Sequence, residues 1–406
     1  MPTGPTASSA VERCTGDPAG FLRDHWARAP LLRSQAGPDG FDDLLSLADV
    51  DRILSTTSPR TPAFRLVKDG QPLPPASYTR SGRIGSQPLS DLPDVGRIYD
   101  HFHAGATIVL QGLHRYWAPL TAFCRELELF LTHPVQVNAY LTPPSSRGLG
   151  VHHDTHDVFV LQVCGRKLWQ VWDAAVSFPL ARQKQLPPGA EAPTGTPLVD
   201  AELVPGDCLY VPRGFRHAAK TAETASLHLT VGVPTYNWNE VLRDVVDLAT
   251  EEAWFREGLP PGFANQPEQL AASLAERVAE LRGFLDKVDL AQVAEQAAGR
   301  FWSRRPPPLT GQLQQLLALD ELDDATVVRR RPGAVCRLHP AGGRLDVQLG
   351  DRQLSMPAAL EPVMRQVLAA GSFTVADLGE HLDGPSRLLL VRRLVREGLL
   401  ESVAVG

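Results

Sequence analysis

Two short stretches of this 406-residue chain carry its clearest chemistry: Val151–Asp154, which reads V-H-H-D, and Gly206–His217. Successive side chains of a β-strand point to opposite faces, so an H-x-D triplet on a strand places an imidazole and a carboxylate side by side. His152 and Asp154 are that pair, and His217 supplies a third group. Two histidines and a carboxylate on one side of a metal, with the opposite positions open, are typical of non-haem Fe(II) sites.

The residues around His217 predict how it is presented. Pro205–Asp207 is typical of a tight turn, and Cys208–Val211 of a short apolar strand. Pro212 and Gly214 then predict the bend that directs His217 to the same face as the triplet.

The residues that follow the triplet predict two more strands. Val158–Val163 is rich in β-forming residues, Gly165–Lys167 suggests a turn, and Leu168–Trp172 alternates as a strand does. Strand, turn and strand on both sides of a metal site favour a double-sheet jelly roll, or cupin.

These segments resemble the JmjC-type cupins of the ribosomal oxygenase group, which are Fe(II)- and 2-oxoglutarate-dependent hydroxylases of protein side chains. The similar segments follow the family's order: Asn138–Pro144, Gly150–Asp154, Phe159–Trp169, Gly206–His217 and Ser226–Thr230. The resemblance implies that His152, Asp154 and His217 bind Fe(II), and that Lys167 binds the distal carboxylate of 2-oxoglutarate. It also implies that the cosubstrate pocket is lined by Asn138, Tyr140, His228 and Thr230.

Lys167 also fits this role on physical grounds. A dianionic oxo acid inside a barrel needs a fixed cation in addition to the metal. Its distance from Asp154 suits the next antiparallel strand. Part of the family has arginine at this place, and the two cations are not interchangeable. Lys167 therefore suggests the lysine-using members, which hydroxylate histidine.

Several histidines leave alternatives open. His153 stands where the family usually has an aromatic residue, and we expect it to be an outward-facing packing residue. His156 could support the metal ligands, line the substrate site or simply pack. Gly232 stands where some relatives have a small hydroxyl residue near 2-oxoglutarate. His101 and His103 form an H-x-H pair, but no third ligand follows at useful spacing, so we do not expect a metal there.

Composition narrows the class of protein. The net charge is -6, which argues against a general nucleic-acid binder, because phosphate recognition relies on surplus Lys and Arg. Residues 1–9 lack the features of a signal peptide, and no apolar run is long enough to predict a membrane span. The five cysteines show no C-x-x-C spacing and are expected to be free thiols. These features predict a cytoplasmic protein.

The fold class expected is mixed α and β, in three parts. Residues 1–236 would hold a helical lead-in, with helical segments at 18–56 and 116–130, and a double-stranded β-helix as the JmjC catalytic domain. Residues 237–305 would be helical, with an apolar stripe along 270–288. The resemblance implies that this part forms a homodimer interface, and packing on the chain's own barrel is the alternative.

Residues 306–406 would be a winged-helix domain with helices at 359–368, 374–382 and 385–397. The third helix carries Arg387, Arg392, Arg393 and Arg396. They could contact DNA, but the acidic chain and the family's own use of this domain favour a solvated face.

Together these features predict an Fe(II)/2-oxoglutarate oxygenase that uses O2 to hydroxylate a histidine or arginine of a protein, and a ribosomal protein is the substrate expected first. Two alternatives remain at this point. One is a hydroxylase of a ribosomally made peptide natural-product precursor. The other is a non-catalytic regulator built from a cupin and a winged helix.

Overall fold

The computed structural model describes residues 9–34, 40–144, 146, 150–185, 193 and 195–403. The expected absence of a signal peptide concerns residues 1–9, and residues 1–8 lie outside the described range. The chain divides into two compact units, Met1–Thr235 and Tyr236–Gly406, which are described separately.

The first unit is built on one large antiparallel sheet. Nine of the described strands form it, in the order β1-β10-β8-β11-β7-β6-β2-β3, with β9 paired to β8; β4 and β5 form a separate hairpin. The strands are β1 (Leu31–Arg33), β2 (Phe64–Lys68), β3 (Gln71–Pro72), β4 (Thr79–Ile84), β5 (Gln87–Pro93), β6 (Thr107–Leu110), β7 (Gln136–Thr142), β8 (Asp157–Ala174), β9 (Val199–Leu203), β10 (Cys208–Val211) and β11 (Phe215–Val233). The helices are α1 (Ser9–Thr15), α2 (Pro18–Gly20), α3 (Leu47–Thr56), α4 (Val95–His103) and α5 (Ala118–Leu131), with short turns of helix at η1 (Phe21–His25), η2 (Pro75–Ser77) and η3 (Leu113–Arg115).

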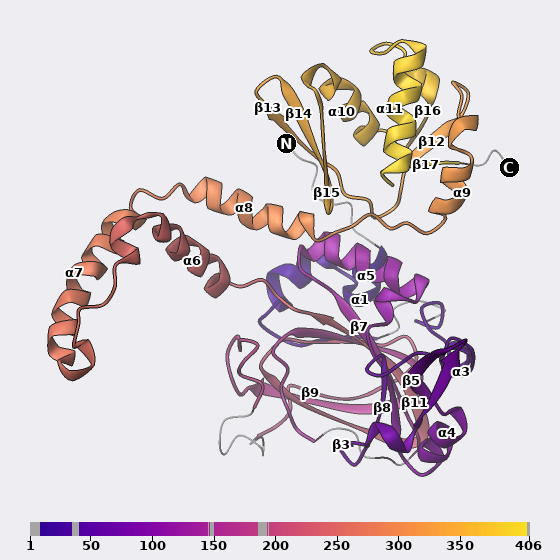
Figure 1. The fold of residues 1–406 in the computed structure, drawn as a ribbon. Helices are drawn as coiled ribbons and strands as arrows, with labels where there is room; N and C mark the ends of the chain where they lie inside the picture. The colour runs from indigo at the N-terminus through magenta and orange to yellow at the C-terminus, as the bar shows by residue number, and fades with distance from the viewer. Residues whose placement is uncertain are drawn as a thin grey trace. The chain divides into compact units, whose positions relative to one another are not determined.

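Alternation along the strands gives the sheet two different faces. In β7, Val137, Ala139 and Leu141 join a large apolar core with residues of α1, α3 and α5, whereas Asn138 and Tyr140 point to the opposite side. Helices α1 and α5 lie against the sheet in Figure 1 and contact β10 and β7, respectively. One face is therefore sealed by helices, and the other encloses the interior of the barrel.

The two longest strands, β8 and β11, pair with each other over most of their length. β8 runs unbroken from Asp157 to Ala174, so the prediction of a turn at Gly165–Lys167 is wrong. Gly165 adopts a φ of +65°, and a Cβ atom there would lie 1.7 Å from the carbonyl oxygen of Ala225. β11 shifts register between Thr221 and Ser226, so the bend is a bulge that both strands share.

The connection from β9 to β11 is as the sequence predicts. The amide of Asp207 donates to the carbonyl of Val204 at 3.0 Å, which closes the turn before β10. Gly214 has a φ of +86°, and a Cβ atom there would lie 1.9 Å from the carbonyl oxygen of Val176. Glycine is thus required at the bend that precedes His217.

The helical lead-in is less regular than expected. Phe41–Leu47, which the sequence predicts as helical, is largely turn, and helix α3 begins only at Leu47. The reason is local: the Ser46 side chain accepts from the amide of Asp49, and the Asp49 side chain accepts in return from the amide of Ser46. This capping box fixes the first residue of the helix.

The second unit begins with helices and ends in a mixed module. Its helices are α6 (Trp238–Asp247), α7 (Pro267–Leu285), α8 (Leu290–Ser303), α9 (Gln312–Leu317), α10 (Glu361–Ala369) and α11 (Gly384–Arg396), with short 3-10 turns at η4 (Leu248–Glu251), η5 (Ala253–Arg256), η6 (Phe263–Asn265), η7 (Leu319–Glu321), η8 (Ala358–Leu360) and η9 (Val375–Leu378). The strands β12 (Val327–Arg330), β16 (Ser372–Thr374) and β17 (Leu400–Ser402) form one sheet, and β13 (Arg337–Ala341), β14 (Arg344–Leu349) and β15 (Arg352–Pro357) form another.

Two of the predicted helices of this module are present, as α10 and α11. The predicted helix at 374–382 is wrong in length, because only η9 forms, although Thr374 caps it as expected. In the helical region expected at 237–305, helix α6 ends at Asp247 and is followed by the short turns η4 and η5. The two small sheets were not expected from the sequence.

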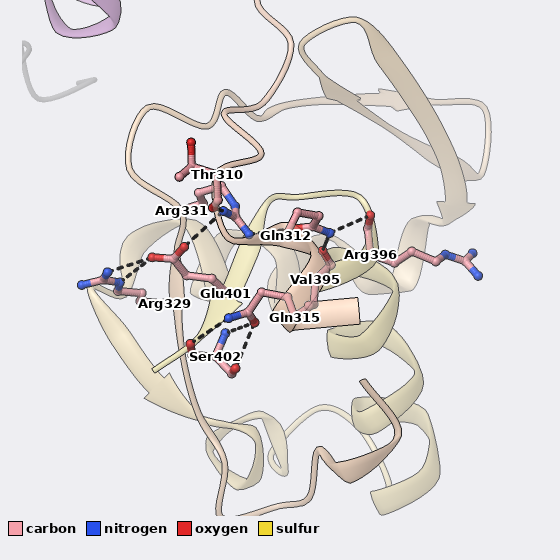
Figure 2. A network of polar contacts seen from close by, with 9 residues as sticks. All are labelled: Thr310, Gln312, Gln315, Arg329, Arg331, Val395, Arg396, Glu401 and Ser402. Carbon is pink, nitrogen blue, oxygen red and sulfur yellow. Dashed lines mark hydrogen bonds and ion pairs between the residues drawn. The ribbon is translucent and has the colours of Figure 1, made fainter. Parts of the chain in front are cut away.

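A polar network holds the start of this module together (Figure 2). The side chain of Gln312 donates to the carbonyls of Val395 and Arg396, at 2.9 and 3.3 Å, which are among the last of α11. The buried Arg331 donates to the Gln312 side chain at 2.6 Å and forms an ion pair with Glu401 at 3.4 Å. Helix α9 is thereby attached to both α11 and β17.

All five cysteines are free, as expected, and Cys14, Cys124 and Cys208 are buried. Among the described helices, none combines the length and the apolar character needed to cross a membrane.

Candidate metal centre and cavity

A cavity of about 280 Å³ lies inside the sheet of the first unit. All eight residues singled out from the sequence line it, so the structure brings them together. Its described lining is Arg65, Val67, Thr107, Val109, Gln136, Asn138, Tyr140, Thr142, His152, Asp154, His156, Val158, Val160, Lys167, Trp169, Val211, His217, Ala219, His228 and Thr230.

The three predicted metal ligands meet at one side of this cavity. One ligand atom from each of His152, Asp154 and His217 lies within 4.8 Å of the other two. The Nε2 atom of His217 is 3.6 Å from a carboxylate oxygen of Asp154. Among the residues that the structure describes, no other group of three histidines, cysteines or acidic residues lies so close together.

The H-x-D triplet is not on a regular strand, contrary to the prediction. It precedes β8, and His152 forms an isolated antiparallel bridge with His217. The amide of His152 donates to the carbonyl of His217 at 3.1 Å, and the reverse bond is 2.8 Å long. The amide of Gly214 donates to the carbonyl of Asp154 at 2.9 Å. The start of β11 therefore holds the triplet in place without a ladder.

Both imidazoles are oriented by the backbone. The Nδ1 atom of His152 lies 2.8 Å from the carbonyl oxygen of Gly150, and that of His217 lies 3.1 Å from the carbonyl oxygen of Phe215. A carbonyl can only accept, so each Nδ1 carries the hydrogen, and each Nε2 is left with its lone pair. Burial, with His152 nearby, lowers the pKa of His217 to about 4 and keeps that ring neutral. Neutral imidazoles are the form that binds metal.

The donor set therefore fits a divalent ion such as Fe(II). It consists of two imidazole nitrogens and one carboxylate, and they occupy one side of the site. This arrangement leaves the cavity side open for further ligands.

Lys167 lies in the same cavity and is only 4% exposed. Its ammonium contacts the hydroxyl of Thr142 at 3.4 Å, and it forms no ion pair with a described carboxylate. Burial lowers the pKa of Lys167 to about 7. It lies on β8 itself, not on the next antiparallel strand as predicted. A buried ammonium without a counterion fits the distal carboxylate of a dicarboxylic acid.

The remaining four predicted residues form two cross-strand pairs between β7 and β11. Thr230 lies opposite Asn138, and His228 lies opposite Tyr140. The Asn138 side-chain oxygen accepts from the amide of Gly112 at 3.0 Å, so its amino group stays available. The rings of Tyr140 and His228 are stacked, with centroids 5.2 Å apart. Burial, and secondarily Lys167, lowers the pKa of His228 well below its usual value.

Of the other histidines considered, His156 lines the cavity, whereas His153 and His101 do not. His153 is buried, does not line the cavity, and its Nε2 lies 2.9 Å from the carbonyl of Gln183. It packs as expected, although it is covered by protein and does not face outward. His156 does line the cavity, so it is not merely a packing residue. His101 of the H-x-H pair contacts the carbonyl of Ser77 and belongs to no metal group.

Arg65 is a cavity residue that the sequence did not suggest. It lies on β2 and is within hydrogen-bonding reach of the Tyr140 hydroxyl. Its neighbours Phe64 and Leu66 belong to the apolar core. The alternation Phe64-Arg65-Leu66 was therefore the available signal that this arginine points inward.

Comparison with known proteins agrees with this geometry. Residues 114–241 match the JmjC domain family. Ribosomal oxygenase 1 of Gallus gallus is 30% identical over 319 residues, which cover 74% of this chain and 51% of the relative. The bifunctional lysine-specific demethylase and histidyl-hydroxylase NO66 of Drosophila pseudoobscura pseudoobscura is 28% identical over 324 residues, or 71% of this chain and 31% of the relative. Residues 114–241 of this chain thus match a JmjC domain, and the chain is similar in sequence to the ribosomal oxygenases.

Solved structures support the fold of this JmjC protein. The ribosomal oxygenase YcfD of Escherichia coli, in complex with cobalt and 2-oxoglutarate, matches with a TM-score of 0.51 and 19% identity, over 95% of this chain and 97% of that one. Another structure of the same E. coli protein gives a TM-score of 0.54 at 21% identity. The cupin-type fold of mixed α and β content is thus confirmed. The chain spans only about half the length of the chicken relative.

Asp154→Ala is expected to abolish tight metal binding by the JmjC domain, because it removes the only carboxylate of the donor set. We expect the affinity for Fe(II) to fall by more than about tenfold, as measured by bound metal per chain, and 2-oxoglutarate turnover to disappear. His153→Ala should retain metal and a measurable part of the turnover. The opposite ranking would contradict the assignment of the ligands.

The affinity for 2-oxoglutarate is expected to depend on pH through Lys167. Its pKa of about 7 in the empty protein means that the ammonium loses its proton above neutrality. Because a bound carboxylate favours the charged form, the affinity should fall by up to about tenfold per pH unit above pH 7. Calorimetric titration with Zn²⁺ in place of Fe(II) measures this. In Lys167→Arg the cation keeps its charge, and the slope should vanish; an affinity that rises with pH would contradict the role of Lys167.

Proposed function

We propose that this protein is an Fe(II)- and 2-oxoglutarate-dependent oxygenase that hydroxylates a side chain of another protein. The observation that carries this proposal is the position of the His152, Asp154 and His217 group in the same cavity as the unpaired, buried Lys167. The metal and the oxo acid, when bound, would supply the oxidising chemistry: 2-oxoglutarate loses CO2 and becomes succinate, which takes up one atom of O2, while the other atom enters a C–H bond of the target.

The chain's own residues hold, orient and shield these groups. His152, Asp154 and His217 would hold Fe(II), and Lys167 with Thr142 would bind the far carboxylate of 2-oxoglutarate. The amino group of Asn138 is available to the cosubstrate, and the hydroxyls of Tyr140 and Thr230 face the same cavity, with the His228 ring beside them. The apolar lining excludes water from the reacting atoms: Val158, Val160, Trp169 and Val211.

The charges of the cavity favour histidine over arginine as the target. The described lining contributes two cations, Arg65 and Lys167, and a single carboxylate, Asp154, which the metal would use. Fe(II) and dianionic 2-oxoglutarate cancel each other, so the occupied site keeps a net positive charge. A guanidinium would find no carboxylate partner there, whereas arginine recognition usually relies on one. A neutral imidazole needs no carboxylate partner, so the positive charge of the site does not oppose its binding.

The relatives support a ribosomal substrate through their names, Ribosomal oxygenase 1 and the histidyl-hydroxylase NO66. These names also favour the protein hydroxylase over the peptide natural-product alternative. The complete group of His152, Asp154 and His217, together with Lys167, argues against a non-catalytic regulator. We therefore place a histidine of a ribosomal protein first and an arginine second.

We propose homodimerisation through the helical region, residues 237–305. Helix α7 has no buried residue, and Leu274 and Val278 of the predicted stripe are 57% and 39% exposed. Leu270, Leu274, Val278 and Leu281 line an apolar pocket of about 460 Å³ together with Trp254. Apolar surface of this kind on a soluble chain usually marks an interface.

The C-terminal part, residues 306–406, is proposed to be a winged-helix domain that does not read nucleic acid. Three of the four arginines on α11 are engaged within the domain. Arg387 donates to Asp324 at 2.8 Å, Arg392 donates to two backbone carbonyls, and Arg393 pairs with Glu397 at 2.9 Å. The helix therefore offers little free positive charge for phosphates.

The substrate is tested by intact mass spectrometry of ribosomal proteins from cells with and without the gene. We expect one protein to be lighter by one oxygen atom in the deletion strain. Matched peptides that carry histidine or arginine at the modified position then test selectivity. Purified enzyme should hydroxylate the histidine peptide at least about tenfold faster. Unchanged ribosomal masses would move the proposal to the peptide alternative.

The dimer is tested by sedimentation of the full chain. Leu274→Glu places a charge in the apolar pocket and should convert the protein to a monomer. Glu276→Lys, on the same helix but outside the pocket, should leave the dimer intact. A wild-type chain that sediments as a monomer at micromolar concentration would remove this proposal.

A further inference from the structure

His156 occupies space that a side chain at position 232 would otherwise fill. A Cβ atom at Gly232 would lie 2.7 Å from Cδ2 and 2.8 Å from Nε2 of His156, closer than such contacts ever occur. Gly232 is not one of the glycines with positive φ, so its backbone does not require glycine. The imidazole in its present position therefore leaves no room for a Cβ atom at position 232.

This pair lies at the end of the cavity away from Lys167. Gly232 faces Gln136 on β7 and Val158 on β8, whereas Lys167 contacts Thr142 at the other end of β7. Six residues of strand separate Gln136 from Thr142, a distance of about 20 Å. Thr142 and Lys167 are 0% and 4% exposed, so that end is closed. Gln136 and His156 are only partly buried.

The imidazole of His156 is also free to bind. It lines the cavity, and it makes no hydrogen bond within the described part of the chain. Other polar groups near this end, Gln136, Asn138 and Thr230, lie on the neighbouring strands β7 and β11. A side chain that approaches the predicted metal ligands from this less buried end would meet the His156 ring.

We propose that His156 is a substrate-contact residue that binds the target side chain, and that Gly232 is what allows it to do so. The inference rests on the proposed function. The ring offers one hydrogen-bond donor, one acceptor and a flat face, which suit a planar, polar side chain. A larger residue at 232 would push the ring out of this position, so the two residues act as one unit.

Binding and turnover together test the pair. The probe is the ribosomal-protein peptide that gains one oxygen, titrated against full-length protein loaded with Zn²⁺ and N-oxalylglycine, so that no reaction occurs. In His156→Ala the peptide Kd should rise at least about tenfold. Gly232→Ala should cause a similar loss. The double variant should be no weaker than His156→Ala, because the ring that the methyl group displaces is already absent.

Three comparisons separate a contact role from a structural one. The Kd for 2-oxoglutarate should stay within about twofold of wild type in all variants, since Lys167 is untouched. His156→Gln should recover part of the peptide affinity. Thr155→Ala, next in the chain but outside the cavity lining, should bind the peptide like wild type.

The outcomes are distinguishable. Peptide binding by His156→Ala at wild-type strength, or losses that multiply in the double variant, would overturn this inference and leave the proposed function intact. Loss of 2-oxoglutarate affinity in His156→Ala would assign the ring to the cosubstrate and also overturn it. Absence of succinate from the wild-type enzyme with every ribosomal protein would overturn both proposals.

Discussion

Two backbone hydrogen bonds between His152 and His217 are the constraint on which the rest of the site depends. They join a segment without regular structure to the start of a long strand, and they bring together ligands that the sequence places far apart. Each ring is then turned by a carbonyl of its own segment, Gly150 or Phe215. The relative position of the two predicted histidine ligands is thus determined by main-chain hydrogen bonds.

In the sheet around this bridge, successive side chains point alternately to the apolar core and to the cavity. Odd and even positions of β7 and of the second half of β11 separate an apolar layer under the helices from a polar inner face. The layer under α1 and α5 stabilises the fold, while the inner face carries Asn138, Tyr140, His228 and Thr230. One side of these strands therefore packs in the core and stabilises the fold, and the other side carries the residues of the candidate site.

The sequence predicted the parts of the site that local chemistry determines. The three ligands, the turn at Pro205–Asp207 and the inward face of β7 all follow from residue types and short spacings. Gly165 misled the prediction, because a glycine with positive φ serves a turn and a bulge equally well, and only the pairing with β11 decides between them. The alternation with Phe64 and Leu66 indicates that Arg65 points away from the core, but only the pairing of β2 with β6 shows that this strand borders the cavity, so Arg65 was missed. The triplet was expected on a strand because its side chains alternate in direction. A single bridge between His152 and His217 is enough to give this alternation.

Lys167 gives the empty protein a property of its own. An ammonium that is almost fully covered and has no counterion among the described residues opposes folding, because attraction to an opposite charge does not compensate for its desolvation. Arrival of a dicarboxylate removes that opposition, so the folded state gains more from its ligand than contact area alone would give. Under the proposed function, 2-oxoglutarate would therefore also stabilise the folded chain, because its distal carboxylate would supply the counterion of Lys167.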